Sequence, residues 1–221
     1  MFVLSSTFLA LLALHLVVVL LYQLNIASGR LPRLYSRFYF DQEANIPTYF
    51  SPILLLMSAV LLAMISGFKK SVGDRWAMHW RVLAILFVLM SLDEAVSLHE
   101  MLNKPLQDLV SISGYLTFGW VFIGLIVVAV LGMSYWRFLW SLERPLRIGI
   151  MAAGGMYVGG TIVMEMIGAR LSSDPGFGTA SLSYMMAVTV EESLEMTGII
   201  LFIAVLAGHL RSNVRTFTLS E

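Results

Sequence analysis

The sequence predicts an all-α, polytopic membrane protein: a bundle of six transmembrane helices with both termini in the cytoplasm, formed as a single domain over residues 1–221. Apolar residues make up 58% of the chain and the mean hydropathy is +0.83, whereas charged residues make up only 13%. A soluble domain typically carries about a quarter charged residues. So few charges cannot coat a water-soluble globule, and a bundle embedded in a membrane is therefore expected.

Six apolar runs approach the roughly 20 residues that a helix needs to cross the hydrocarbon core. They should be helices, because lipid offers the backbone no hydrogen-bond partner outside the segment. The first run should be retained rather than cleaved as a signal peptide, since no Lys or Arg precedes Arg30. The expected spans cover about residues 8–24, 49–68, 76–102, 118–140, 148–170 and 184–210.

The distribution of Lys and Arg predicts the orientation. Six spans put both termini on one side, and that side collects nine basic residues against five on the other. We therefore expect cytoplasmic termini and a location in the inner or plasma membrane. The first loop on the opposite side, residues 31–50, interleaves Arg with Tyr and Phe. This composition is typical of a segment at the membrane interface, and the alternative is a lid over an external site.

The fifth run carries two features that should draw it into the bundle. Gly155 and Gly159 have the four-residue spacing that lets membrane helices approach closely. Glu165 follows on the same run with only apolar residues around it. We therefore expect Glu165 to point inward, towards the other helices.

Acidic residues gather inside or at the edge of three predicted spans, although an ionised carboxylate near the bilayer centre costs on the order of 3 kcal/mol. At about 1.5 Å per residue, Asp93, Glu165 and Glu195 each lie roughly 24–27 Å from the cytoplasmic end of their helix. Three helices thus place carboxylates in one layer near the external boundary of the hydrocarbon core. The acids concerned are Asp93, Glu94, Glu100, Glu165, Glu191, Glu192 and Glu195.

Helical spacing groups these acids on shared faces. Asp93 and Glu100 are seven residues apart on one face, and Glu191 and Glu195 are four apart on another. The helix dipole favours negative charge near an N-terminus, which alone could account for Glu191 and Glu192. The acids of the third and fifth spans lie towards C-terminal ends, so they need partners of another kind.

Basic residues are scarce in this layer, so either some carboxyl groups are protonated or a cation supplies the missing positive charge. Carboxylates with a single imidazole suit a divalent metal, Fe, Mn, Zn or Ca. The absence of Cys excludes thiolate zinc sites and Fe–S clusters. The expected metal ligands are Asp93, Glu94, His99, Glu165, Glu191 and Glu195, with Glu192 and Glu100 as the candidate catalytic acids or bases.

Three classes of function fit this pattern. A metal-dependent membrane enzyme would act on a lipid or lipid-linked substrate, with Glu192 as general base. An accessory subunit of a larger membrane complex would use the acids to hold Ca²⁺ or a partner's basic residues. A cation or proton transporter would use them as a pathway. Membrane lipids and other membrane subunits are the expected partners, and the zero net charge gives no sign of nucleic-acid binding.

Overall fold

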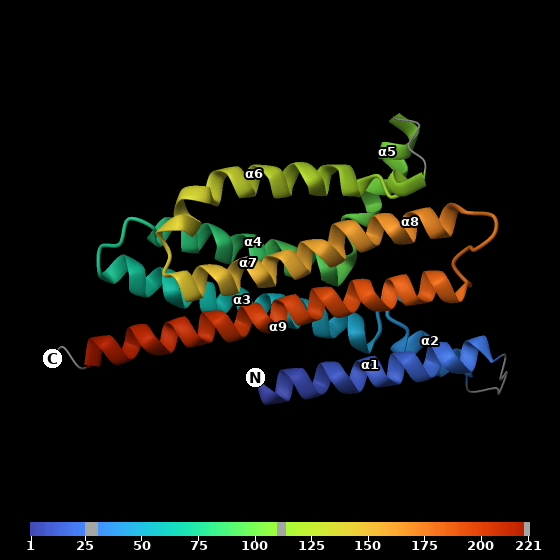
Figure 1. The fold of residues 1–221 in the computed structure, drawn as a ribbon, viewed down its shortest axis with the longest axis horizontal. Coiled ribbons are helices and arrows are strands. Elements are labelled where there is room, and N and C mark those ends of the chain that lie inside the picture. The colour runs from blue at the N-terminus through green and yellow to red at the C-terminus, as the bar shows by residue number, and fades with distance from the viewer. Residues whose placement is uncertain (25–30, 110–113, 219–221) are drawn as a thin grey trace.

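The computed structural model describes residues 1–24, 31–109 and 114–218, which form helices joined by short connections (Figure 1). In chain order the elements are α1 (Phe2–Gln23), α2 (Leu31–Phe38), α3 (Ile46–Ser71), α4 (Ala77–Val96), the 3₁₀ helix η1 (Glu100–Leu102), α5 (Asn103–Leu109), the 3₁₀ helix η2 (Gly114–Leu116), α6 (Trp120–Ser141), α7 (Arg144–Val158), the π-helical turn η3 (Gly159–Met164), α8 (Glu165–Ser173) and α9 (Leu182–Thr218).

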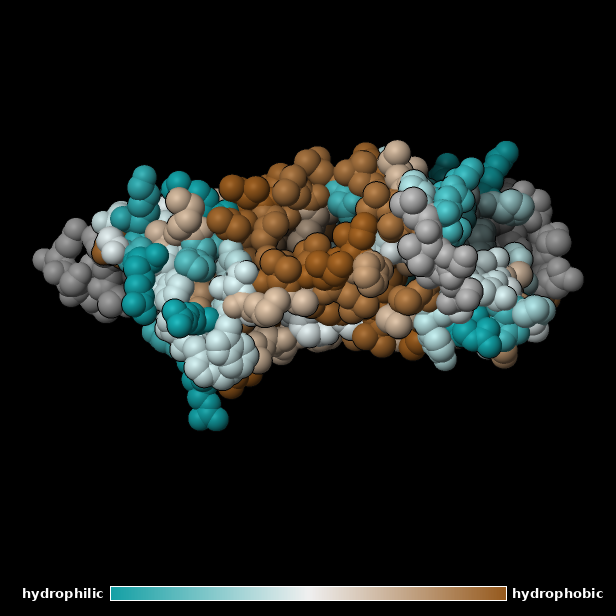
Figure 2. Space-filling model, turned by 90° about the horizontal axis from the view of Figure 1, so that it is seen from above, coloured by the Kyte–Doolittle hydropathy of each residue, from teal (hydrophilic) through white to brown (hydrophobic). Residues whose placement is uncertain are grey.

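Five helical segments of the described chain are long and apolar enough to cross a membrane. A sixth candidate is the pair formed by α4 and Glu100–Asp108, which is bent by 71°. The space-filling surface has an apolar band between two hydrophilic ends, as a bilayer requires (Figure 2). The prediction of an all-α, multi-pass membrane protein is confirmed, with five or six candidate spans.

The third predicted span, residues 76–102, is not one continuous helix. Helix α4 ends at Val96, and Ser97 adopts the left-handed conformation, with φ 50° and ψ 45°. The Asp93 carboxylate accepts a hydrogen bond from the backbone N–H of His99, at 2.9 Å. A side chain that takes a backbone donor in this way competes with continuation of the helix. The expectation that Glu100 shares a helical face with Asp93 was therefore wrong.

Helix α9 runs through the middle of the bundle and contacts α1, α3, α7, α8 and η3. One buried apolar cluster joins α1, α3 and α9, and a second joins α3, α4, α6, α7 and α9. Helix α6 is the outlier, because it lies at the edge of the bundle and packs only sparsely on α7 and η3 (Figure 1). Between lipid-embedded helices such contacts stabilise by close packing rather than by removal from water.

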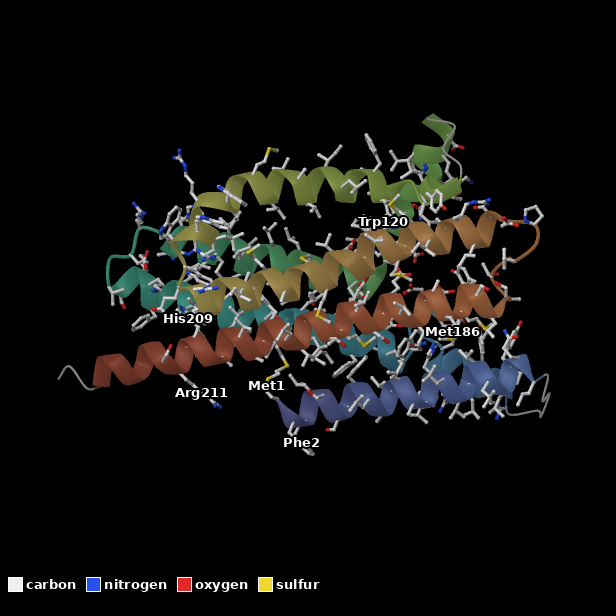
Figure 3. All side chains as sticks on the ribbon, in the orientation of Figure 1. Met1, Phe2, Trp120, Met186, His209 and Arg211 are labelled. Atoms are coloured by element: carbon white, nitrogen blue, oxygen red, sulfur yellow. The ribbon has the colours of Figure 1, made fainter. Side chains whose placement is uncertain are left out.

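The two ends of the bundle differ. The C-terminal part of α9 forms one end, whereas α1 begins partway along the bundle (Figure 1). Met1 of α1 and Arg211 of α9 line a common groove (Figure 3). The opposite end carries α2, α5 and α8, and we call it the α5 end (Figure 1). The side of the membrane that each end faces stays a prediction from the basic residues.

The fifth span is a long helix, Arg144–Ser173, interrupted by the π-turn η3. A Cβ atom added to Gly155 or Gly159 would meet nothing within 4 Å, so the prediction that this pair mediates close packing was wrong. The close approach to α9 occurs at Gly160, where a Cβ would lie 2.7 Å from Cγ of Glu195. Gly160 follows Gly159 by one residue, which corresponds to about 100° of helix rotation. The helix face that packs on α9 is therefore rotated by about 100° from the face that was predicted to pack.

Candidate acidic pocket

A cavity of about 120 Å³ lies inside the bundle towards the α5 end. Carboxyl side chains from the loop before α3, from α4 and η1, from α8 and from α9 line it, together with one imidazole. No Lys or Arg is among the described residues that line it. We call this cavity the acidic pocket; its charged or titratable lining residues are Asp41, Glu43, Asp93, Glu94, His99, Glu100, Glu165, Glu191, Glu192 and Glu195, besides Tyr157.

All eight residues that the sequence analysis singled out line this one pocket. They come from three separate spans, so the helices converge as their depths in the membrane indicated. Glu195 is the most buried of them, with 7% of its surface exposed. Glu100 is exposed and reaches the pocket from η1, beyond the break in α4.

The break in α4 fixes the position of the imidazole. One Asp93 carboxylate oxygen accepts the His99 backbone N–H, and the other lies 2.9 Å from Nδ1 of the same His99. A carboxylate that holds Nδ1 orients the ring and leaves Nε2 as the nitrogen that can meet a ligand. The edge of the His99 ring also packs against Trp120, with 4.7 Å between the ring centroids.

Trp120 couples α6 to the pocket. Its indole Nε1–H donates a hydrogen bond of 3.0 Å to Oε1 of Glu165. Trp120 is the first residue of α6, and its side chain, which is 9% exposed, points towards α8 (Figure 3). Glu165 is the first residue after the π-turn η3, a type of helix irregularity that recurs at functional sites. This hydrogen bond thus joins the first turn of α6 to the pocket.

The acids of α9 lie well inside the helix. Because α9 begins at Leu182, Glu191 and Glu192 lie more than two turns from its N-terminus. The dipole acts mainly within the first turn, so it does not account for these two acids. Gly160 brings η3 against the Glu191–Glu195 turn, where any larger residue would collide with it.

The sequence analysis missed Asp41 and Glu43, which enter the pocket from the loop between α2 and α3. The Tyr184 hydroxyl donates to the Asp41 carboxylate, at 3.2 Å to Oδ1. Asp41 is exposed as a residue, but its carboxyl group, which lines the pocket, is removed from much of the surrounding water. This desolvation raises the pKa of Asp41 to about 7, against the lowering effect of the Tyr184 hydrogen bond, and nearby carboxylates, Glu165 first, add to it.

His15 holds this loop in place. The Phe40 backbone N–H donates to Nδ1 of His15 at 3.1 Å, so the proton of the neutral ring is on Nε2. Nε2 then donates to Oγ1 of Thr189 at 2.8 Å, and the Thr189 hydroxyl donates to the Met185 carbonyl. The buried ring stacks on Phe40 with 4.0 Å between centroids. The loop therefore contributes Phe40, Asp41 and Glu43 to the pocket lining, and the alternative interpretation of residues 31–50 as a lid stays a prediction.

The geometry does not form a closed metal centre. No group of three or more His, Asp or Glu side chains in the described chain is placed to hold a metal ion. The six predicted ligands share a cavity without forming one coordination sphere. A divalent ion would require several of these carboxylates to change rotamer.

The fold and the pocket define a class: a multi-pass membrane protein with a carboxylate-lined cavity among its helices. Within that class, the chain belongs to the family described as Domain of unknown function (DUF8692), whose model matches residues 8–210. No curated protein and no solved structure matches the chain.

Proposed function

We propose that this protein binds a positively charged group in the acidic pocket, within the membrane and close to the surface that the α5 end faces. The observation that carries the proposal is the composition of the pocket: nine carboxyl residues line it, with no Lys or Arg among the described lining residues. Carboxyl groups crowded together must either hold protons or be neutralised by a cation. From the distribution of basic residues, this surface is the external face of the cell membrane.

The pocket suits a small cation. Its volume of about 120 Å³ is well above the roughly 15 Å³ that one water molecule needs, so it can hold an ion with water or an ammonium group. Phe40 and Trp120 line it beside the acids, and aromatic faces attract ammonium groups. Both kinds of cation share the chemistry of positive charge held by carboxylates.

A metal-dependent enzyme is the second candidate, and the Asp93–His99 pair favours it. A carboxylate that holds Nδ1 of a histidine is the usual outer partner of a metal-ligating imidazole. In this case the side chains would rearrange around a metal ion, and the predicted ligands are Asp93, Glu94, His99, Glu165, Glu191 and Glu195. Glu192 or Glu100 would exchange a proton with a lipid or lipid-linked substrate. Transport has less support, because a buried apolar cluster of α3, α4, α6, α7 and α9 lies between the pocket and the opposite end.

Thermal unfolding tests the proposal. The purified protein in detergent is heated with Ca²⁺, Mn²⁺, Zn²⁺ or ethylammonium, each compared with NaCl at equal ionic strength. A ligand at 100 times its Kd adds about 2.7 kcal/mol, which corresponds to roughly 5–10 °C in Tm for a chain of this size. The Glu165→Gln, Glu195→Gln double variant should lose this shift, and Glu143→Gln, at an exposed position outside the pocket, should keep it.

The two candidates give different results in this assay. Stabilisation by ethylammonium supports binding of an organic cation, whereas stabilisation by a divalent metal alone, reversed by a chelator, supports the metal enzyme. No shift beyond the NaCl control with any of these ions would overturn the proposal. A shift that the double variant keeps in full would do the same.

A further inference from the structure

A second cavity, of about 270 Å³, lies between α6 and the rest of the bundle. Helices α4, α6, α7 and α9 all contribute to its walls, which are almost entirely apolar. We call it the apolar crevice. Representative lining residues are Phe87, Met90, Leu131, Ile150, Val158 and Phe202.

The apolar crevice and the acidic pocket adjoin each other. Tyr157 lines both cavities. On α4 the last crevice residue, Met90, is three residues before Asp93 of the pocket, and on α9 Gly198 of the crevice is three residues after Glu195. Three residues of helix span about 4.5 Å. Along α4 and α9, therefore, an apolar lining changes to an acidic one within a single turn.

Helix α6 forms one wall of the apolar crevice and contacts the rest of the bundle on both sides of it. It is attached near the pocket by the Trp120–Glu165 hydrogen bond, and near its other end by Tyr135, whose hydroxyl donates to the His79 carbonyl at 3.2 Å. Between these points Gly132 of α6 faces open space, as does Gly154 of α7 on the opposite wall. An apolar space of this kind suits hydrocarbon rather than water.

We propose that the apolar crevice holds the hydrocarbon chain of a membrane amphiphile whose ammonium headgroup lies in the acidic pocket. Charge complementarity selects the occupant: a pocket of carboxylates attracts an amine and repels the phosphate of a common phospholipid. The ligand class is thus a long-chain amine without a phosphate. This inference rests on the proposed cation binding and adds the apolar part of the ligand to it.

Photo-crosslinking in phosphatidylcholine nanodiscs tests it. The probe is a long-chain primary amine with a diazirine in mid-chain, and the control probe is the alcohol with the same chain. The amine should label peptides of α6 and α7 more than the alcohol by about tenfold, the ratio that corresponds to about 1.4 kcal/mol. Excess ethylammonium should reduce the labelling by the amine, because it competes for the acidic pocket alone.

Two glycine variants make the test specific to the apolar crevice. A Cβ added at Gly154 or Gly155 meets nothing within 4 Å. Gly154→Leu places its side chain at the crevice wall of α7, whereas Gly155→Leu places the same side chain at the next position, which does not line the crevice. Gly154→Leu should abolish the labelling, and Gly155→Leu should keep it. Equal labelling in the two variants, or equal labelling by amine and alcohol, would overturn the inference.

The experiments also distinguish failure of this inference from failure of the proposed cation binding. If ethylammonium still raises the Tm of both glycine variants while the crevice is not labelled, the acidic pocket binds cations and the hydrocarbon part of this inference is wrong. If neither ethylammonium nor the long-chain amine binds, the proposed function itself fails.

Discussion

Replacement of Gly160 by Ala should destabilise the protein and disorder the acidic pocket. A Cβ at this position would lie 2.7 Å from Cγ of Glu195 and 2.8 Å from the backbone oxygen of Glu191. Because one of these contacts is with backbone, a side-chain rotation cannot relieve it, and η3 and α9 must separate. Overpacking of this kind typically costs about 1–3 kcal/mol. For a chain of this size the loss corresponds to roughly 2–12 °C in Tm.

The matched control is Gly159→Ala, one residue earlier in the same π-turn, where the added Cβ meets nothing within 4 Å. It should leave Tm unchanged or raise it slightly, because Ala is favoured over Gly in helices by about 0.5–1 kcal/mol. Thermal unfolding followed by tryptophan fluorescence measures both variants, with and without the cation. Gly160→Ala should also weaken the cation-induced shift, since Glu191 and Glu195 move with α9. Equal Tm values for the two variants would refute the reasoning.

Further predictions concern the contacts around the pocket. Trp120→Phe removes the donor to Glu165 and should cost about 0.5–1.5 kcal/mol, the usual net contribution of one hydrogen bond, measured as a drop in Tm. His15→Phe leaves buried backbone and hydroxyl groups without their partner and should cost about 1–3 kcal/mol in the same assay. The raised pKa of Asp41 means that the folded state holds this proton more tightly than the unfolded chain does. Its contribution to stability is therefore present below about pH 4 and lost as the pH rises through about 7, and Asp41→Asn should remove this part of the pH dependence.

The Trp120 and Asp41 predictions each have a matched control and a contrary outcome. Trp140→Phe changes a half-exposed indole of α6 and keeps an aromatic ring against Trp136 and Arg147, so it should change Tm little. If it costs as much as Trp120→Phe, the hydrogen bond to Glu165 is not the cause. For the pH profile, Asp108→Asn is the control, because Asp108 is exposed on α5, outside the pocket. Identical Tm–pH profiles for the wild type and Asp41→Asn would contradict the Asp41 assignment.

The sequence by itself determined the class of the protein and the level of its acidic residues in the membrane. Hydropathy is a property of short segments, so the apolar runs located the candidate spans. Helices α3 and α9 contain their predicted ranges, and α1 and α6 overlap most of theirs. The rise per residue then placed Asp93, Glu165 and Glu195 at one depth, because a helix converts sequence distance directly into height.

Only the tertiary structure decided which surfaces meet at that depth. The rotation of one helix against another depends on all its contacts, so the packed glycine is Gly160 and not the Gly155–Gly159 pair. The side chain of Asp93 competes for backbone donors and ends α4 early, which hydropathy does not record. Asp41 reaches the pocket because His15, 26 residues earlier in the chain, holds the Phe40 backbone. The apolar crevice beneath α6 likewise exists only because four helices leave a space between them, and no single segment encodes such a space.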